Sequence, residues 1–117
     1  MYPPRLLEHF RHPRHVGELG PPAVTVQVSN PACGDLLRLS ALLEDGVLRQ
    51  VRYQVRGCTA SIAAGSALAE WLTGRTLAEA AALDASTIDA ALGGLPPASR
   101  HAAALCVEAV RALAAAL

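Results

Sequence analysis

The spacing of hydrophobic residues changes at Gly57–Cys58, and this change restricts the fold more than any other feature of the sequence. Before it, Val alternates with polar residues over 24–28, which is the period of a β-strand, and two more strand patterns follow at 37–41 and 47–55. Glu-Asp-Gly at 44–46 is a typical hairpin turn between the last two segments. The sequence therefore predicts a three-stranded antiparallel meander.

Helical patterns flank this meander. Thr59 to Thr73 is rich in Ala with larger apolar residues at helical spacing, and Gly74 is a typical helix stop. Thr76 and Glu79 have the spacing of a capping box. We predict helices over 5–10, over 59–73, from 76, over 84–92 and from 99 onward. The predicted fold class is α+β, a three-stranded antiparallel sheet with helices packed on one face, and residues 1–117 are expected to form a single domain.

Composition excludes several classes of function. All 10 basic residues are Arg and none is Lys, so Schiff-base and lysine-nucleophile chemistry are unavailable. The formal net charge is zero at pH 7, without the basic footprint of a nucleic-acid-binding protein. We therefore expect no nucleic-acid partner.

The apolar runs at 60–72 and 102–117 contain charged residues and rely on Ala, so neither is expected to span a membrane. The opening Met-Tyr-Pro-Pro-Arg carries no apolar core of a signal peptide. We expect a cytoplasmic protein without a membrane partner. In a reducing compartment its three cysteines are expected to be metal ligands, reactive thiols or small packing residues rather than disulfide partners.

Two of these cysteines lie in segments suited to metal chemistry. Cys33 sits in N-P-A-C-G-D, residues 30–35, where Asp35 can point to the same side of a turned or extended loop. Cys58 follows a glycine at the start of a predicted helix, where the helix dipole favours a thiolate. The hairpin would bring both loops to one end of the sheet, giving three of the four ligands of a tetrahedral zinc or iron site. The alternative is that both cysteines are buried packing residues.

Taken in order, these motifs resemble the IscU/NifU family of iron-sulfur cluster scaffold proteins and its zinc-binding SufU relatives. The likeness rests on N-P-A-C-G-D, on R-G-C-T-A-S-I-A-A-G-S-A-L-A-E-W-L-T-G-R-T-L-A-E-A at 56–80, and on L-L-E-H-F-R-H-P-R-H-V-G-E-L at 6–19. It implies an IscU/SufE-like fold. It also implies a protein that receives sulfur from a cysteine desulfurase, assembles a [2Fe-2S] cluster with iron and passes it on, whereas SufU members hold Zn and accept sulfur for transfer.

Carried over residue by residue, the resemblance assigns Cys33, Asp35 and Cys58 to the metal or cluster. The last helix departs from the family pattern. In an ungapped alignment, His101 takes the family's His position, and Ala102 stands where the family has a cysteine.

A competing alignment inserts four residues and makes Cys106 the family cysteine, but the residues that follow fit less well. The ungapped register implies a metal set of Cys33, Asp35, Cys58 and His101. Cys106 would then lie one helical turn later, as a reserve ligand or sulfur acceptor.

Both candidates in the last helix have a structural alternative. Cys106 shares an apolar stripe with Ala109 and Leu113, which suits core packing. His101 has the alternative of a solvated residue at a helix start, although neutral imidazole is a common ligand of Zn and iron. The three other histidines, His9, His12 and His15, are expected in a solvated or partner-facing segment because Pro13 breaks any helix that would join them.

We expect a scaffold or carrier rather than an enzyme, with no catalytic residues and with a [2Fe-2S] cluster or iron, or Zn in its place, as the bound group. One alternative is a zinc-bound sulfur acceptor that works with a desulfurase; another is a degenerate member with a structural Zn site. SufU proteins carry an insertion before the last helix that residues 74–96 lack, which favours the scaffold.

The resemblance implies a cysteine desulfurase as a partner, together with frataxin-like proteins, Hsp70-type chaperones and apo iron-sulfur proteins. Leu95-Pro96-Pro97 resembles the start of the loop that Hsp70-type chaperones grip in IscU proteins. Ala98-Ser99 replaces the usual valine-lysine after it, which departs from that recognition motif.

Overall fold

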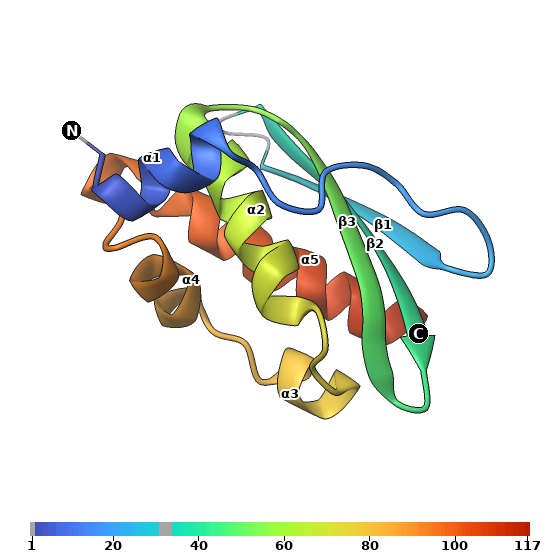
Figure 1. Cartoon of the computed structure of the whole chain (residues 1–117). Helices are drawn as coiled ribbons and strands as arrows, with labels where there is room; N and C mark the ends of the chain where they lie inside the picture. The colour runs from blue at the N-terminus through green and yellow to red at the C-terminus, as the bar shows by residue number, and fades with distance from the viewer. Residues whose placement is uncertain (1, 31–33) are drawn as a thin grey trace.

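The computed structural model describes residues 2–30 and 34–117, and Figure 1 shows their arrangement. The elements are α1 (Pro4–Arg11), β1 (Val24–Asn30), β2 (Asp35–Glu44), β3 (Val47–Arg56), α2 (Thr59–Leu72), α3 (Leu77–Ala81), α4 (Ala85–Ala91), a 3-10 turn (Pro97–Ser99) and α5 (His101–Ala116). The predicted α+β class is confirmed. None of the described helices is long and apolar enough to cross a membrane.

The three strands form one antiparallel sheet in the order β1-β2-β3. Leu39 in the central strand pairs with Val26 on one side and Tyr53 on the other. The β2–β3 hairpin turns at Asp45 and Gly46, whose φ angles are +53° and +76°, values that favour Gly, Asn and Asp. The predicted meander is confirmed, and its register decides which side chains face the helices.

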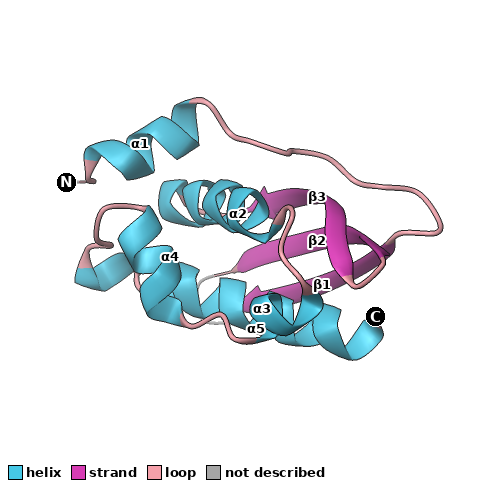
Figure 2. Ribbon diagram, turned by 60° about the horizontal axis from the view of Figure 1, so that its bottom comes forward, coloured by secondary structure: helices cyan, strands magenta, loops and turns pink. Residues whose placement is uncertain are grey.

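Helices cover one face of this sheet. α2 packs beside β3 and α5 beside β1, while α1 lies against α2 and α4 against α5 (Figure 2). The core between the layers consists of alternate strand residues and Ala-rich helix faces, including Leu37, Leu39, Ala41, Val51, Ala60, Ala63, Ala64, Ala67, Leu68, Ala109 and Leu113. Small side chains let the helices lie close to the strands. Most residues of α2 are buried, because the helix packs against α1, β3 and α5.

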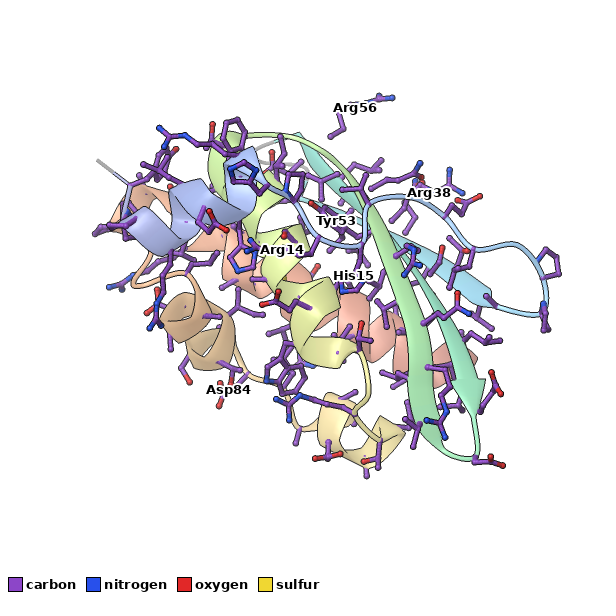
Figure 3. The ribbon with its side chains drawn as sticks, in the orientation of Figure 1. Arg14, His15, Arg38, Tyr53, Arg56 and Asp84 are labelled. Atoms are coloured by element: carbon purple, nitrogen blue, oxygen red, sulfur yellow. The ribbon has the colours of Figure 1, made fainter. Side chains whose placement is uncertain are left out.

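The contact between α2 and β3 is especially close at Gly65. A Cβ built there would lie 2.5 Å from Cδ2 of Tyr53 and 3.0 Å from Cγ2 of Val55. Tyr53 is a β3 residue whose side chain lies between that strand and α2 (Figure 3). Only glycine permits this approach without displacing the aromatic ring.

The ends of the short helices follow the sequence signals. Thr76 Oγ1 accepts a hydrogen bond from Glu79 N at 3.1 Å, and Glu79 Oε1 accepts one from Thr76 N at 2.9 Å, which confirms the capping box. The last helix begins at His101 rather than at the predicted Ser99. The reason is that Pro97 opens a 3-10 turn, which comes before the regular helix.

The expectation of a solvated histidine is wrong for His9. Its side chain is buried, and Nδ1 lies 2.8 Å from Oγ of Ser66 on α2. The backbone N–H of Arg14 donates to the same hydroxyl at 2.9 Å, and the Arg14 guanidinium pairs with Glu8 at 2.6 Å, at the junction of α1 and α2 (Figure 3). α1 is amphipathic and buries Leu6 and His9 together against α2. The helix break at Pro13, on which the prediction rested, does not show this packing.

Residues 12–23 connect α1 to β1 and run past β3 (Figure 1). Val16 forms an isolated parallel bridge with Tyr53, and Glu18 pairs with Arg38 on β2 at 2.7 Å. His12 is exposed in this segment, as expected. The segment thus pairs briefly with the edge of β3 that faces away from β2 on its way to the first strand.

Candidate metal centre

Three elements meet at one end of the sheet, and each begins with a residue of the predicted site. Asp35 is the first residue of β2, Cys58 is the N-cap of α2, and His101 is the first residue of α5. Because β2 and β3 are antiparallel, the start of β2 lies beside the end of β3, two residues before Cys58. The hairpin therefore brings Asp35 and Cys58 together as the sequence indicated.

The side chains of these three residues converge. One ligand atom from each lies within 4.8 Å of the other two. His101 Nε2 lies 3.0 Å from Asp35 Oδ2 and 3.6 Å from Cys58 Sγ, and this sulfur lies 3.8 Å from the same carboxylate oxygen. Imidazole, carboxylate and thiolate are all ligands of zinc and iron in proteins. Of the predicted set, the structure brings Asp35, Cys58 and His101 together, and Cys33 lies outside the described residues.

The carboxylate of Asp35 is buried and held by several partners. It is 3% exposed. Ser61 Oγ donates to Oδ2 at 2.5 Å, and the backbone N–H of Cys58 donates to Oδ1 at 3.3 Å. His101 Nε2 lies 3.0 Å from Oδ2 as well. A buried carboxylate needs such partners to offset its lost hydration, and they also fix its orientation toward the thiol.

Gly57 leaves the space that this carboxylate occupies. A Cβ at position 57 would overlap Oδ1 of Asp35 and would lie 2.8 Å from its Cγ. Any side chain at this position would therefore force the carboxylate out of its place. The glycine before Cys58 is a requirement of the site and not only of the turn.

Cys58 combines accessibility with a favourable electrostatic position. Its side chain is half-buried, and as N-cap it lies at the positive end of α2. Its sulfur lies 3.3 Å from Ser61 Oγ. A half-buried thiol in this position is accessible to a metal ion or a sulfur donor.

The structure does not bring Cys106 into this group. Its side chain is 1% exposed, and its Sγ lies 3.6 Å from the carbonyl oxygen of Ala64 on α2. Burial raises the pKa of this thiol to about 12, so the thiol stays protonated at neutral pH. Cys106 shares its buried helix face with Ala109 and Leu113, as the apolar stripe predicted.

The residue after His101 supplies no ligand. Ala102 is 1% exposed and belongs to the core. His101 itself keeps 22% of its side chain exposed, so its ring is accessible from outside while Nε2 points at Asp35. At the start of the last helix it is therefore His101, and not Cys106, that lies beside Asp35 and Cys58.

Sequence reasoning missed Ser61 and Gly57 as parts of the site. A signal for Ser61 was present, because a residue three positions after Cys58 on a helix faces the same side. The role of Gly57 depends on where the hairpin places Asp35, and no local pattern shows that.

Fold and site together define a class: a small α+β domain that presents a thiol, a carboxylate and an imidazole at one end of a three-stranded sheet. The family model described as the NifU-like N terminal domain matches residues 1–116. The chain belongs to this family.

Curated relatives agree with the family match. The chain is 36% identical over 115 residues to the iron-sulfur cluster assembly scaffold protein IscU of Azotobacter vinelandii, covering 95% of this chain and 89% of that protein. It is 34% identical over 111 residues to the scaffold protein IscU 1 of Archaeoglobus fulgidus, covering 95% and 72%. It is 44% identical over 111 residues to the bifunctional protein NifU/MnmA of Rubrobacter xylanophilus, and this match spans only 23% of that protein.

Solved structures share the fold. A protein described as an iron-sulfur cluster assembly scaffold for the SUF system, from Fervidobacterium islandicum, superposes with a TM-score of 0.80 at 16% identity, covering 97% of this chain and 96% of that chain. The N-terminal part of a NifU-like protein from Brucella abortus gives a TM-score of 0.65 at 28% identity, covering 94% and 77%. The first likeness, at its low identity, shows the fold alone.

Proposed function

We propose that this chain is a scaffold or carrier for iron-sulfur cluster assembly that takes iron and sulfur as cargo and passes them on. The observation that carries the proposal is the convergence of Asp35, Cys58 and His101, with ligand atoms within 4.8 Å of one another. Family membership supports it, because relatives from two organisms bear the name of cluster assembly scaffold proteins.

Cys33 would complete the set of ligands. It stands two residues before Asp35, in the N-P-A-C-G-D motif. Two thiolates, one carboxylate and one imidazole give four donors, the number that a tetrahedral ion or a [2Fe-2S] cluster takes from a protein. Asp35 is a poorer partner for iron-sulfide than a thiolate is, so its presence would keep the cargo labile, as a donor requires.

Sulfur acceptance would fall to Cys58 or Cys33. Cys58 is half-buried at a helix N-terminus, whereas Cys106 is fully buried with a raised pKa. A thiol that stays protonated inside the core is a poor acceptor of sulfur. We therefore assign core packing to Cys106, and its alternative role as a ligand would require α5 to rotate.

A cysteine desulfurase as sulfur donor and apo iron-sulfur proteins as recipients are the partners that this function requires. A frataxin-like partner remains a proposal from the family resemblance. Recognition by an Hsp70-type chaperone faces an obstacle, because Leu95 is buried and its N–H donates to Asp89 Oδ1 at 2.6 Å. That loop would have to open before a chaperone could grip it.

A second candidate function is a zinc-bound sulfur acceptor. It is favoured by Ala102, which leaves the last helix with a histidine and no accessible thiol beside it. A mixed nitrogen, oxygen and sulfur set suits Zn well, and a closed four-ligand Zn site can be structural. The two functions differ in whether sulfide accumulates on the protein.

The test is anaerobic reconstitution with ferrous iron, cysteine and a cysteine desulfurase, followed by measurement of bound iron, acid-labile sulfide and the visible spectrum. A scaffold is expected to gain stoichiometric iron and sulfide with sulfide-to-iron charge-transfer bands. Retention of Zn without sulfide would instead support the sulfur acceptor.

Two variants make this experiment specific. Cys58→Ser should abolish cluster formation, whereas Cys106→Ala should leave it intact because Cys106 lies outside the ligand group. Full cluster content in Cys58→Ser would contradict the proposed site.

A further inference from the structure

Ser61 lies in the first turn of α2, between two of the proposed ligands. Its side chain is buried, with 2% exposed. Its Oγ lies 2.5 Å from Asp35 Oδ2 and 3.3 Å from Cys58 Sγ. One hydroxyl thus touches both the carboxylate and the thiol, although it belongs to neither ligand.

The direction of the shorter hydrogen bond follows from its partners. A serine hydroxyl has one hydrogen to donate, and an ionised carboxylate only accepts. Ser61 therefore donates to Asp35, and its own lone pairs remain for the Cys58 side. Bonds from a hydroxyl to a carboxylate are short and about twice as strong as neutral ones, which agrees with the 2.5 Å separation.

This bond restrains the oxygen that faces the other ligands. Oδ2 is also the atom that lies 3.0 Å from His101 Nε2 and 3.8 Å from Cys58 Sγ, whereas Oδ1 is turned to the backbone N–H of Cys58. Ser61 and that N–H together hold one oxygen each. The orientation and the position of the carboxylate are therefore both fixed in the metal-free protein.

We propose that Ser61 is a positioning residue that orients Asp35 for metal and cluster binding. This inference rests on the proposed function, because it concerns the same ligands. Without the hydroxyl, Oδ2 would lose its shortest contact, the buried carboxylate would turn toward other donors, and the metal would have to reorient it at each binding event. Residues that support metal ligands in this way contribute about 10- to 100-fold to affinity.

The experiment is a titration of the metal-free protein with Co²⁺, followed by Zn²⁺ competition. Co²⁺ reports the thiolate and the ligand geometry through its charge-transfer and d–d bands. Ser61→Ala is expected to bind about tenfold more weakly and with altered d–d bands. Ser61→Thr keeps a hydroxyl at the same atom and should restore most of the affinity.

Thr59→Ala is the matched control, since Thr59 lies in the same helical turn and its hydroxyl has no hydrogen-bond partner among the described residues. It should bind Co²⁺ as the unsubstituted protein does. Circular dichroism of each metal-free variant shows whether it is folded. If Ser61→Ala does not fold, Ser61→Thr remains as a folded variant for the test.

A double-mutant cycle separates positioning from a general effect on the fold. If Ser61 acts through Asp35, Ser61→Ala should cost little affinity in an Asp35→Ala background, where there is no carboxylate to orient. An equal loss in both backgrounds, or no loss in either, would overturn the inference and leave the metal site intact. Failure of the unsubstituted protein to bind Co²⁺ or Zn²⁺ would instead overturn the proposed function, and the inference with it.

Discussion

His101 Nε2 lies 3.0 Å from Asp35 Oδ2, so the first residue of the last helix and the first residue of the second strand share one polar contact. This contact joins α5 to the sheet at the end where Cys58 begins α2. The start of α5 buries Ala102 and turns His101 toward the carboxylate. Among the described residues of α5, His101 is the one that joins the group of Asp35 and Cys58.

Replacing His101 by Ala should weaken Zn²⁺ binding by more than about tenfold, because one of the four proposed donors is lost. Competition with a chromophoric chelator measures the change. His12→Ala is the control, since His12 is exposed near the N-terminus and outside the group. Equal affinity of His101→Ala and the unsubstituted protein would show that this histidine is not a ligand.

Replacing Cys106 by Ala should leave metal affinity unchanged and lower the free energy of unfolding by about 1 kcal/mol, since the change removes one buried sulfur from the core. Denaturant unfolding of the metal-free protein and Co²⁺ titration measure the two effects separately. A marked loss of the Co²⁺ thiolate band would mean that Cys106 reaches the metal.

Replacing Gly57 by Ala should displace Asp35, because the added Cβ would overlap its carboxylate. We expect a loss of metal affinity together with a destabilisation of about 1–3 kcal/mol, the range for inserting a methyl group into a packed site. Gly20→Ala is the matched control, since nothing lies within 4 Å of a Cβ built there. Wild-type affinity in Gly57→Ala would contradict the tight fit.

Stability should fall on mild acidification because of His9. Its burial, and next the nearby Arg14, lower the pKa of His9, with opposing effects from Glu70 and Glu8. The unfolded chain then takes up a proton at a higher pH than the folded protein does. The stabilisation from neutral His9 is complete above its unfolded pKa, about 6.5, and is lost as the pH falls through the lower folded value.

Urea unfolding of the metal-free protein between pH 7.5 and 5 tests this dependence. His9→Gln should flatten it, because the variant has no proton to take up at this position, whereas the exposed His12→Gln should not. An unchanged slope in His9→Gln would assign the acid sensitivity to another group.

Local patterns in the sequence predicted most of the fold. Alternating Val residues, the Glu-Asp-Gly turn and the Thr76 capping box each depend on only a few neighbouring residues. The structure therefore contains the predicted strand, turn and helix start. The burial of His9 depends on Ser66 of a different helix, and a local sequence pattern cannot predict such a distant partner.

The parts of the candidate site that lie in sequence motifs could be predicted. The parts whose position depends on packing between segments could not. Asp35 and Cys58 meet because a hairpin joins their strands, which the strand pattern already implied. Cys106 could be assigned to the core only once α5 was seen to turn it toward Ala64. Ser61 and Gly57 gain their roles from the position of Asp35, which belongs to another segment.

The most direct test of the proposed metal centre is X-ray absorption at the Zn edge of the zinc-loaded protein, which counts sulfur ligands separately from nitrogen and oxygen ligands. The site of Cys33, Asp35, Cys58 and His101 predicts two sulfur ligands at about 2.3 Å and two nitrogen or oxygen ligands at about 2.0–2.2 Å. Cys58→Ser should leave one sulfur, and Cys106→Ala should leave two. Three sulfur ligands in the unsubstituted protein, or none, would contradict the account.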